Sequence, residues 1–125
     1  MTSRFRSGID LIEIERVEDS IKRHGDRFLN RIFTSQELID CEGNTHSLSA
    51  RFAAKEAAAK ALGCGIGEVS WQDIEVIRNS DRQPGLLLHG VAQDLAKKLK
   101  LTIWSLSLSH THQNAIALVI ASGDD

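Results

Sequence analysis

The chain has 125 residues, of which 42% are hydrophobic and 26% charged, with a formal net charge of -2. This size and composition fit one globular domain over residues 1–125 and exclude a disordered or fibrous chain. A slightly acidic chain lacks the overall positive charge that nucleic-acid binding normally needs. No apolar run approaches the roughly 20 residues that span a bilayer, and the start MTSRFRSG lacks the apolar core of a signal peptide. We therefore expect a cytoplasmic protein that binds neither nucleic acid nor membrane.

The first third of the chain predicts a short strand followed by helices. Residues 5–9 form an apolar start, and Asp10 stands where this strand is expected to end. From Leu11 to Arg23, apolar residues recur at spacings of three and four, which predicts an amphipathic helix. A second helix is expected to start at Thr34 or Ser35, since Glu37 lies at the capping-box distance from Thr34.

A long helix is expected over residues 47–62, SLSARFAAKEAAAKAL. This segment contains seven alanines and no glycine or proline, so its intrinsic helix propensity is the highest in the chain. Gly63, the first glycine of GCGIG, is expected to end the helix. A phosphate-binding loop is the weaker interpretation, because such loops precede a helix and the C-terminal end of a helix dipole repels anions.

The second half of the chain alternates between strand and helix patterns. The expected elements are a strand at 73–77, a turn at 79–85, a strand at 86–88, a helix at 90–100, and two strands at 102–109 and 115–121 that form a hairpin. Together with the first half, they predict an α+β fold in which a mainly antiparallel sheet packs with the long alanine-rich helix.

Two carboxylates are candidates for a metal site. Glu56 lies in FAAKEAAAK, where alanines on three sides leave it open to approach, and Asp10 follows the first strand. Mg²⁺ commonly takes one or two protein carboxylates and completes its shell with water and substrate phosphates. The alternative is that Glu56 only pairs with Lys60 at the i,i+4 spacing, and the residues by themselves favour that alternative.

Three cations share the long helix. Arg51, Lys55 and Lys60 could hold a phosphate, because a cation one turn from a metal ligand is well placed to bind the same anion. Phe52, Glu56 and Lys60 follow one another along a single stripe. The alternative is a charged face that is simply solvated.

Histidines and cysteines give weaker signals. His110 and His112 would share a face in extended geometry and could begin a zinc site, although no third ligand is evident; one of them is more simply a hydrogen-bonding residue. His24, His46 and His89 are expected on the surface. The cysteines, at positions 41 and 64, form no CxxC pattern and fit buried or incidental thiols.

A local basic patch stands out in this acidic chain. Arg16, Lys22, Arg23 and Arg27 lie close in sequence, with Phe28 beside them. Such a patch suits an acidic protein partner, because charge complementarity speeds encounter and fixes register. The alternative is a charged solvent face, since acidic residues are interleaved with the arginines.

Five segments carry a family resemblance over nearly the whole chain: GIDLIEIERV, IFTSQEL, RFAAKEAAAKALGCGIG, WQDIEV and SLSHTHQNAIALVIA. In this order and spacing they resemble the holo-acyl-carrier-protein synthase family, the compact class of 4'-phosphopantetheinyl transferases. The resemblance implies that fold and a transfer of phosphopantetheine from coenzyme A to a serine of acyl carrier protein, releasing adenosine 3',5'-bisphosphate. It also implies a homotrimer with coenzyme A in clefts between subunits. One departure is SDRQPG, where the family usually has a glycine and a basic residue before the proline, so no contacts are assigned to the Pro84 loop.

The resemblance also implies roles for individual residues. Asp10 and Glu56 would ligate Mg²⁺ and, with Lys60 on the phosphates, form the catalytic set. The general base stays unassigned, with Glu56 only as a hypothesis. Contacts to coenzyme A would come from Arg51, Lys60, Gly63, Ser109, His110 and Thr111. The acidic carrier would dock on Arg16, Arg23, Arg27 and Phe28.

Three other classes of protein remain open at this point. A carrier-binding module without activity could lose Asp10 or Glu56, and both are present. A regulator would bind coenzyme A without turnover. A zinc hydrolase would rest on His110 and His112.

Overall fold

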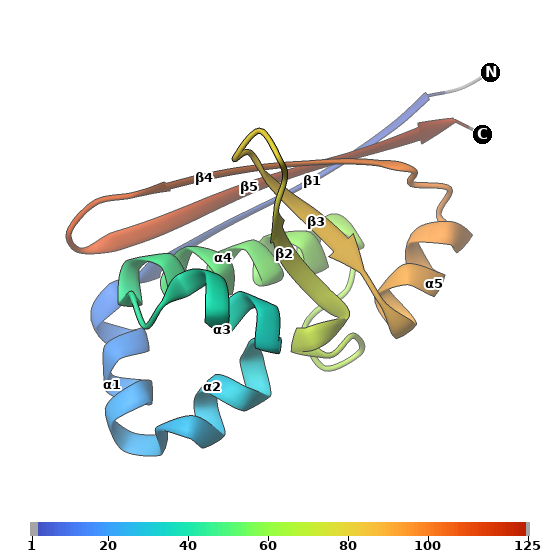
Figure 1. Ribbon diagram of the computed structural model, residues 1–125. Coiled ribbons are helices and arrows are strands. Elements are labelled where there is room, and N and C mark those ends of the chain that lie inside the picture. Colours follow the sequence, from blue (N-terminus) through green and yellow to red (C-terminus); the bar gives the residue numbers. More distant parts are fainter. Residues whose placement is uncertain (1–2, 125) are drawn as a thin grey trace.

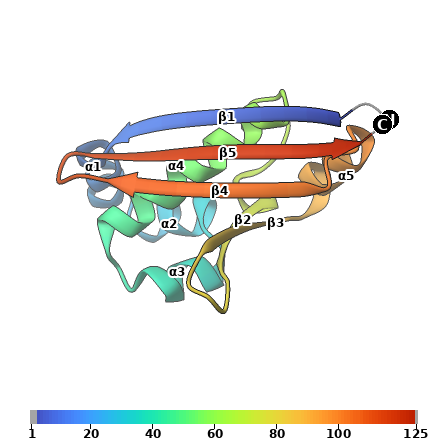
Figure 2. The ribbon, with the colours of Figure 1, turned by 90° about the horizontal axis from the view of Figure 1, so that it is seen from above.

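Strands from the two ends of the chain form the main sheet in the computed structural model, which describes residues 3–124. Strand β1 (Ser3–Glu13) pairs antiparallel with β5 (Asn114–Asp124) along its whole length, and β5 pairs antiparallel with β4 (Ile103–His110). The strand order is therefore β1-β5-β4. Figure 2 shows the start of β1 and the end of β5 side by side at one edge of the molecule, where Ser3 pairs with Asp124.

Helix α4 (Thr45–Ala61) lies across one face of this sheet (Figure 1). Alternate residues of β5 point at it, and all of them are fully buried: Ala115, Ala117, Val119 and Ala121. The helix packs against them with its own alanines, of which Ala53, Ala57 and Ala61 have no exposed surface. Small side chains on both elements let the helix and the sheet approach closely, and this contact is the centre of the core.

Gly8 brings β1 onto the helix. A Cβ atom built at this position would overlap the carbonyl oxygen of Ala57, so the strand backbone rests directly on the α4 backbone. A glycine without a side chain is the residue that permits such an approach.

The remaining elements surround the ends of α4. Figure 1 shows α1 (Ile14–His24), α2 (Asp26–Ile32) and α3 (Ser35–Cys41) grouped around the start of the long helix. Further along the chain come η1 (Trp71–Asp73), an antiparallel two-stranded sheet of β2 (Ile74–Arg78) and β3 (Pro84–Leu88), and α5 (Gly90–Lys98). A second apolar cluster fills the space between α2, α3 and α4, with Ile32, Phe33, Cys41 and Leu48 buried at its centre.

Most of the predicted elements are confirmed. The fold is α+β with antiparallel sheets, the alanine-rich helix and the final hairpin are present, and the remaining predicted boundaries shift by only a few residues. The capping box is also present: Thr34 N donates to Glu37 Oε1 at 2.8 Å, and Glu37 N donates to Thr34 Oγ1 at 3.2 Å.

The end of α4 confirms the interpretation of Gly63 as a helix stop. Gly63 has φ +80, its N–H donates to Lys60 O at 3.0 Å, and Cys64 N–H donates to Ala59 O at 3.1 Å. This is the Schellman arrangement. Both N–H groups are therefore used by the helix, which disfavours the GCGIG segment as a phosphate cradle.

Two features of the first third differ from the prediction. The first strand does not end at Ile9 but continues through Glu13, so Asp10 lies inside β1 and the helix begins at Ile14. The cause is the pairing of β1 with β5, in which Leu11 lies opposite Ile116. Helix α2 was not predicted. Among residues 3–124, no helix combines the length and the hydropathy needed to cross a membrane.

We predict that Gly8→Ala destabilises the protein by about 1–3 kcal/mol, because the added methyl group forces β1 and α4 apart. Gly65→Ala is the matched control, since a Cβ there meets nothing within 4 Å. Urea denaturation measures both changes. Equal midpoints for the two variants would show that the contact with Ala57 does not require glycine.

Candidate functional site

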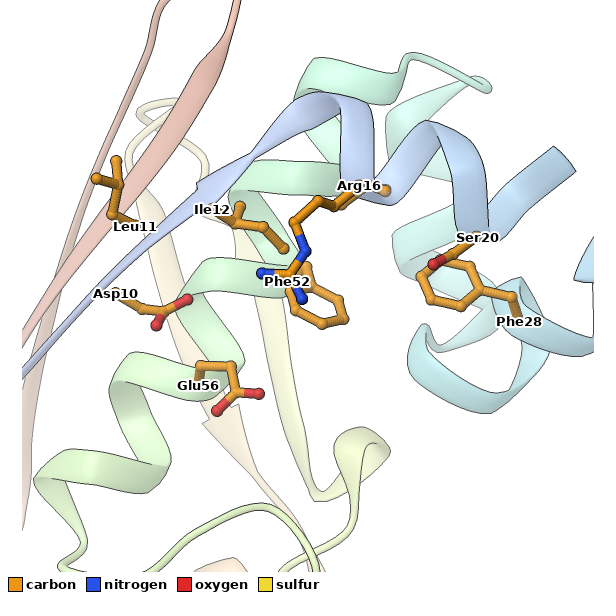
Figure 3. Close-up of a pocket in the computed structure, with 9 residues that line it drawn as sticks. Asp10, Leu11, Ile12, Arg16, Ser20, Phe28, Phe52 and Glu56 are labelled. Carbon is orange, nitrogen blue, oxygen red and sulfur yellow. The ribbon is translucent and has the colours of Figure 1, made fainter. Parts of the chain in front are cut away.

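A pocket of about 350 Å³ opens where β1, α1, α2 and α4 meet. Its lining residues are Asp10, Leu11, Ile12, Arg16, Val17, Ser20, Phe28, Phe52 and Glu56. Figure 3 shows the carboxyl groups of Asp10 and Glu56 facing the same space from β1 and α4, with the guanidinium group of Arg16 reaching in from α1. The two carboxylates predicted from the sequence are thus brought together.

The pleat of β1 aims Asp10 into this pocket. Successive side chains of a strand point to opposite faces, so Gly8, Asp10 and Ile12 face α4 while Ile9 lies on the outer face with 54% of its surface exposed. The close approach at Gly8 brings the strand down to the helix two residues before Asp10. The same glycine that forms the core contact therefore positions the carboxylate.

The two carboxylates lack full compensation by positive charge. Burial raises the pKa of Glu56, the negative charge of Asp10 raises it further, and Lys60 only partly opposes both effects. A carboxylate whose charge is disfavoured by burial and by a like-charged neighbour is stabilised by any cation that binds between them. The pair is thus suited electrostatically to a hard cation.

Lys60 lies at the rim of this pair. Its ammonium group donates to the carbonyl oxygen of Ile9 at 2.8 Å and to Asp10 Oδ1 at 3.3 Å, and 54% of its side chain is exposed. The ion pair of Lys60 is therefore with Asp10 in the facing strand, not with Glu56 in its own helix. The alternative of a simple i,i+4 pair is therefore incomplete: Lys60 still lowers the pKa of Glu56 through its charge, but its close contact is with Asp10.

Lys55 does not face solvent, so the expectation that it could hold a phosphate is wrong. Its side chain has no exposed surface, and its ammonium group donates to Glu37 Oε1 at 2.8 Å and to the carbonyl oxygens of Trp71 and Ile74 at 3.1 and 2.6 Å. Burial lowers the pKa of Lys55, and Glu37 opposes this effect. One residue along a helix is a rotation of about 100°, which turns Lys55 away from the pocket that Glu56 faces.

Arg51 is also turned away from the two carboxylates. Only 6% of its surface is exposed, Nη1 donates to Ser47 O at 3.4 Å, and Nε is buried without a hydrogen-bond partner among residues 3–124. Its charge acts on Cys41, where burial raises the thiol pKa and Arg51 partly counteracts this. The guanidinium group thus lies on the α3 side of α4.

The predicted histidine site lies on the opposite edge strand of the sheet, β4, with His110 level with Ile12 of β1. His110 ends β4, its ring lies 5.3 Å from that of His46, and both line a pocket of about 470 Å³. The other lining residues are Asn44, Ser47, Thr111 and His112. His112 lies in the turn after β4 rather than in extended geometry, so the two predicted histidines do not share a strand face.

Sequence reasoning missed His46, which it placed among surface residues. Its only sequence signal was its place at the start of a helix, and nothing local indicates that this start lies beside the β4–β5 turn. Ser109 points the other way, to the outer face of the sheet, because it alternates with His110. Among residues 3–124, no three His, Cys, Asp or Glu side chains are grouped to hold a metal ion.

The basic patch adjoins the carboxylate pocket. Arg16 lines that pocket, Arg16 and Arg23 line a neighbouring groove on α1, and Arg27 and Phe28 line another on α2. Phe28 is only partly exposed, since its ring stacks on Phe52 with centroids 6.3 Å apart. The basic patch therefore begins at the pocket with Arg16 and extends away from it along α1 and α2.

Comparison with known proteins places this fold and pocket in one family. The model of the 4'-phosphopantetheinyl transferase superfamily matches residues 6–119, so the chain belongs to that superfamily. Relatives named holo-[acyl-carrier-protein] synthase include one from Herpetosiphon aurantiacus, 47% identical over 94% of this chain and 98% of its own length. Another, from Moorella thermoacetica, is 49% identical over 93% of this chain and 92% of its own length. The resemblance identified from the sequence motifs is confirmed.

Solved structures agree with this assignment. The holo-[acyl-carrier-protein] synthase of Helicobacter pylori, in complex with coenzyme A, matches with a TM-score of 0.85 and 34% identity over 92% of this chain and 98% of its own. The synthase from Bacillus anthracis, in complex with coenzyme A (3',5'-ADP), matches with a TM-score of 0.77 and 36% identity over 95% and 96%. The predicted transferase fold is thereby confirmed.

We predict that Asp10→Asn lowers the pKa of Glu56 toward its ordinary value, because the substitution removes the negative charge that raises it. Carboxyl-carbon NMR titration measures the shift. Asp19→Asn, on the exposed side of α1, is the control and should leave the pKa of Glu56 in place. An unchanged pKa in Asp10→Asn would contradict the electrostatic coupling of the two carboxylates.

Proposed function

We propose that this chain transfers the 4'-phosphopantetheine group of coenzyme A to a serine of apo acyl carrier protein. The products are holo carrier protein and adenosine 3',5'-bisphosphate. The observation that carries this proposal is the convergence of Asp10 and Glu56 in one pocket beside a basic helix, in a chain whose relatives are holo-[acyl-carrier-protein] synthases. The relative from Helicobacter pylori is seen with coenzyme A bound.

We propose Mg²⁺ as the cation held by Asp10 and Glu56. Two carboxylates are the oxygen donors that Mg²⁺ prefers, and its remaining positions are usually filled by water and substrate phosphate. The raised pKa of Glu56 supports the fit, because a bound cation would offset both burial and the charge of Asp10. When bound, Mg²⁺ neutralises the negative charge that builds on the departing phosphate.

The side chains around this pocket bind and orient the substrates. In the transfer, the serine oxygen bonds to the β-phosphorus of coenzyme A as the bond to the bridging oxygen breaks. The electron pair of that bond leaves with the bisphosphate, and the serine hydroxyl releases its proton. Lys60 is suited to hold the phosphates, because its ammonium group is half exposed and uses two of its three donors. Arg16 adds a second positive charge on the α1 side.

We propose that the pocket at the start of α4 also contacts coenzyme A. His110 and Thr111 line it, and His46 joins them as a residue that sequence reasoning had not included. Ser109 reaches only ligand bound on the outer face of the sheet. Contacts from Arg51 and Gly63 stay predictions; the unpartnered Nε of Arg51 supports the first, and the engaged N–H of Gly63 argues against the second.

We propose a homotrimer assembled through the outer face of the main sheet. This face exposes a group of large apolar side chains, Phe5, Ile9, Leu11, Ile103, Leu118 and Ile120. Contiguous apolar patches of this kind mark protein interfaces. A ligand held partly by Ser109 would then lie where two subunits meet, which supports coenzyme A between subunits. We also propose a cytoplasmic location, supported by the free thiols of Cys41 and Cys64.

Incubation of the purified chain with coenzyme A, Mg²⁺ and an apo carrier protein tests the activity. We expect the intact carrier to gain the mass of phosphopantetheine. Glu56→Gln should lower kcat at least about 100-fold, since outer residues of metal sites alone account for about 10–100-fold. Asp94→Asn, an exposed carboxylate on α5, is the control and should leave turnover unchanged. No mass gain with any of several carriers would refute the proposed function.

Charge reversal on the basic patch tests the docking face. We predict that Arg23→Glu combined with Arg27→Glu raises the KM for carrier protein roughly tenfold and leaves the KM for coenzyme A nearly unchanged. Both residues lie outside the carboxylate pocket, so the chemistry should be spared. Lys97→Glu with Lys98→Glu makes the same change in net charge on α5. If that control raises the carrier KM as much, the effect belongs to net charge rather than to a docking face.

A further inference from the structure

The activity proposed above requires α4 to stand at one rotation about its axis. Glu56 enters the pocket from this helix, and a displacement by one residue turns a helical side chain by about 100°. Helices are normally held at one rotation by large side chains that interlock with their neighbours. The buried side chains of α4 therefore decide at which rotation the helix is held.

The apolar surface of α4 is poorly shaped for that task. Its buried residues lie on several sides of the helix, and most of them are alanines: Ala50, Ala53, Ala54, Ala57, Ala58, Ala59 and Ala61. Methyl groups at so many positions present similar surfaces at different rotations. The alanines therefore permit the close approach to the sheet but specify the rotation weakly.

The large apolar side chains Leu48 and Phe52 pack nearer the start of α4. Lys55 adds a directional contact immediately beside Glu56. It is fully buried, and its three donors point to three acceptors: Glu37 Oε1, Trp71 O and Ile74 O. These acceptors come from α3, η1 and the start of β2. All three N–H groups of the ammonium are thus hydrogen-bonded. A rotation of α4 would break all three hydrogen bonds at once inside the core.

Glu37, the side chain that accepts from Lys55, is itself fixed by further hydrogen bonds. Glu37 Oε1 also accepts from Thr34 N at 2.8 Å, and Oε2 accepts from Val76 N at 2.9 Å. Thr34 donates through its hydroxyl group to Glu75 Oε2 at 2.7 Å. Glu37 is therefore tied to both α3 and β2 before it meets the lysine.

We infer that the buried Lys55–Glu37 ion pair sets the rotation of α4 and so directs Glu56, the next residue, toward Asp10. Lys55 is a positioning residue, because it is not among the residues that line the carboxylate pocket. The inference rests on the proposed function only for what Glu56 binds. Buried ion pairs add little net stability compared with apolar residues of the same volume, and their best-attested use is to select one register.

The test measures the electrostatic coupling between Asp10 and Glu56 in a variant that lacks the Lys55–Glu37 ion pair. Lys55→Met is combined with Glu37→Gln, so that no charge is left unpaired. The shift in the Glu56 pKa caused by Asp10→Asn is then measured by NMR in this background and in the native one. Because the shift is a difference within each background, the loss of the Lys55 charge itself cancels. We expect the shift to be present in the native protein and lost in the double variant.

Binding of Mn²⁺, a paramagnetic substitute for Mg²⁺, is the second measurement. We expect the double variant to bind Mn²⁺ about 10–100-fold more weakly, as for other residues that orient metal ligands, with the KM for carrier protein unchanged. Leu48→Ala is the stability control: it removes a buried side chain from the same helix and leaves the ion pair intact. It should lower the melting temperature and keep both the Asp10–Glu56 coupling and the Mn²⁺ affinity.

The outcomes separate the two proposals. If the double variant keeps the Asp10–Glu56 coupling and the Mn²⁺ affinity, the positioning role is overturned. The Lys55–Glu37 ion pair then has a purely structural role. Failure of the native protein to bind Mn²⁺ counts against the proposed metal site, while the coupling measurement still decides the rotation. If the double variant does not fold, Lys55→Met by itself decides, since it removes all three hydrogen bonds of the ammonium group and leaves Glu37 bonded to Thr34 N and Val76 N; undiminished coupling in that variant would overturn the inference.

Discussion

The direct contact between the backbones of β1 and α4 is the constraint on which the rest of the structure depends. Gly8 and Ala57 put almost nothing between the strand and the helix. The alanines of β5 and of α4 extend the same close approach across the sheet. Two residues beyond Gly8, this approach brings Asp10 within electrostatic reach of Glu56. The packing of the core and the geometry of the pocket are thus consequences of one set of small residues.

Around α4, neighbouring charges have opposite surroundings. Lys55 is buried with all of its donors satisfied, whereas Glu56 faces a pocket in which its charge is disfavoured. A complete ion pair holds structure, and an incomplete group of like charges is suited to a cation. Lys55 and Glu56 are consecutive residues, so they differ only by a rotation of about 100° around the axis of α4. This is why a charge pattern such as KEAAAK cannot be interpreted without knowing which side of the helix is covered.

Local chemistry explains what could be predicted from the sequence. The capping box at Thr34, the propensity of seven alanines and the glycine after the long helix act over a few residues, and each was placed correctly. The pairing of Asp10 with Glu56 was reached because both belong to motifs of a known family. The features that could not be predicted depend on contacts with residues far away in the sequence. The length of β1 depends on β5, the burial of Lys55 on Glu37, and the contact of His46 on the position of His110.

The pairing of β1 with β5 also dictates when the pocket can exist. Asp10 lies on the first strand, and that strand is held in its sheet by the last one, across most of the length of the chain. Contacts between segments so distant in sequence form late and slowly, since a large loop must close first. During synthesis, the two carboxylates therefore meet only after nearly the whole chain has been made. A partly translated chain can form α4 and its cap, but Asp10 and Glu56 are not yet held in one pocket.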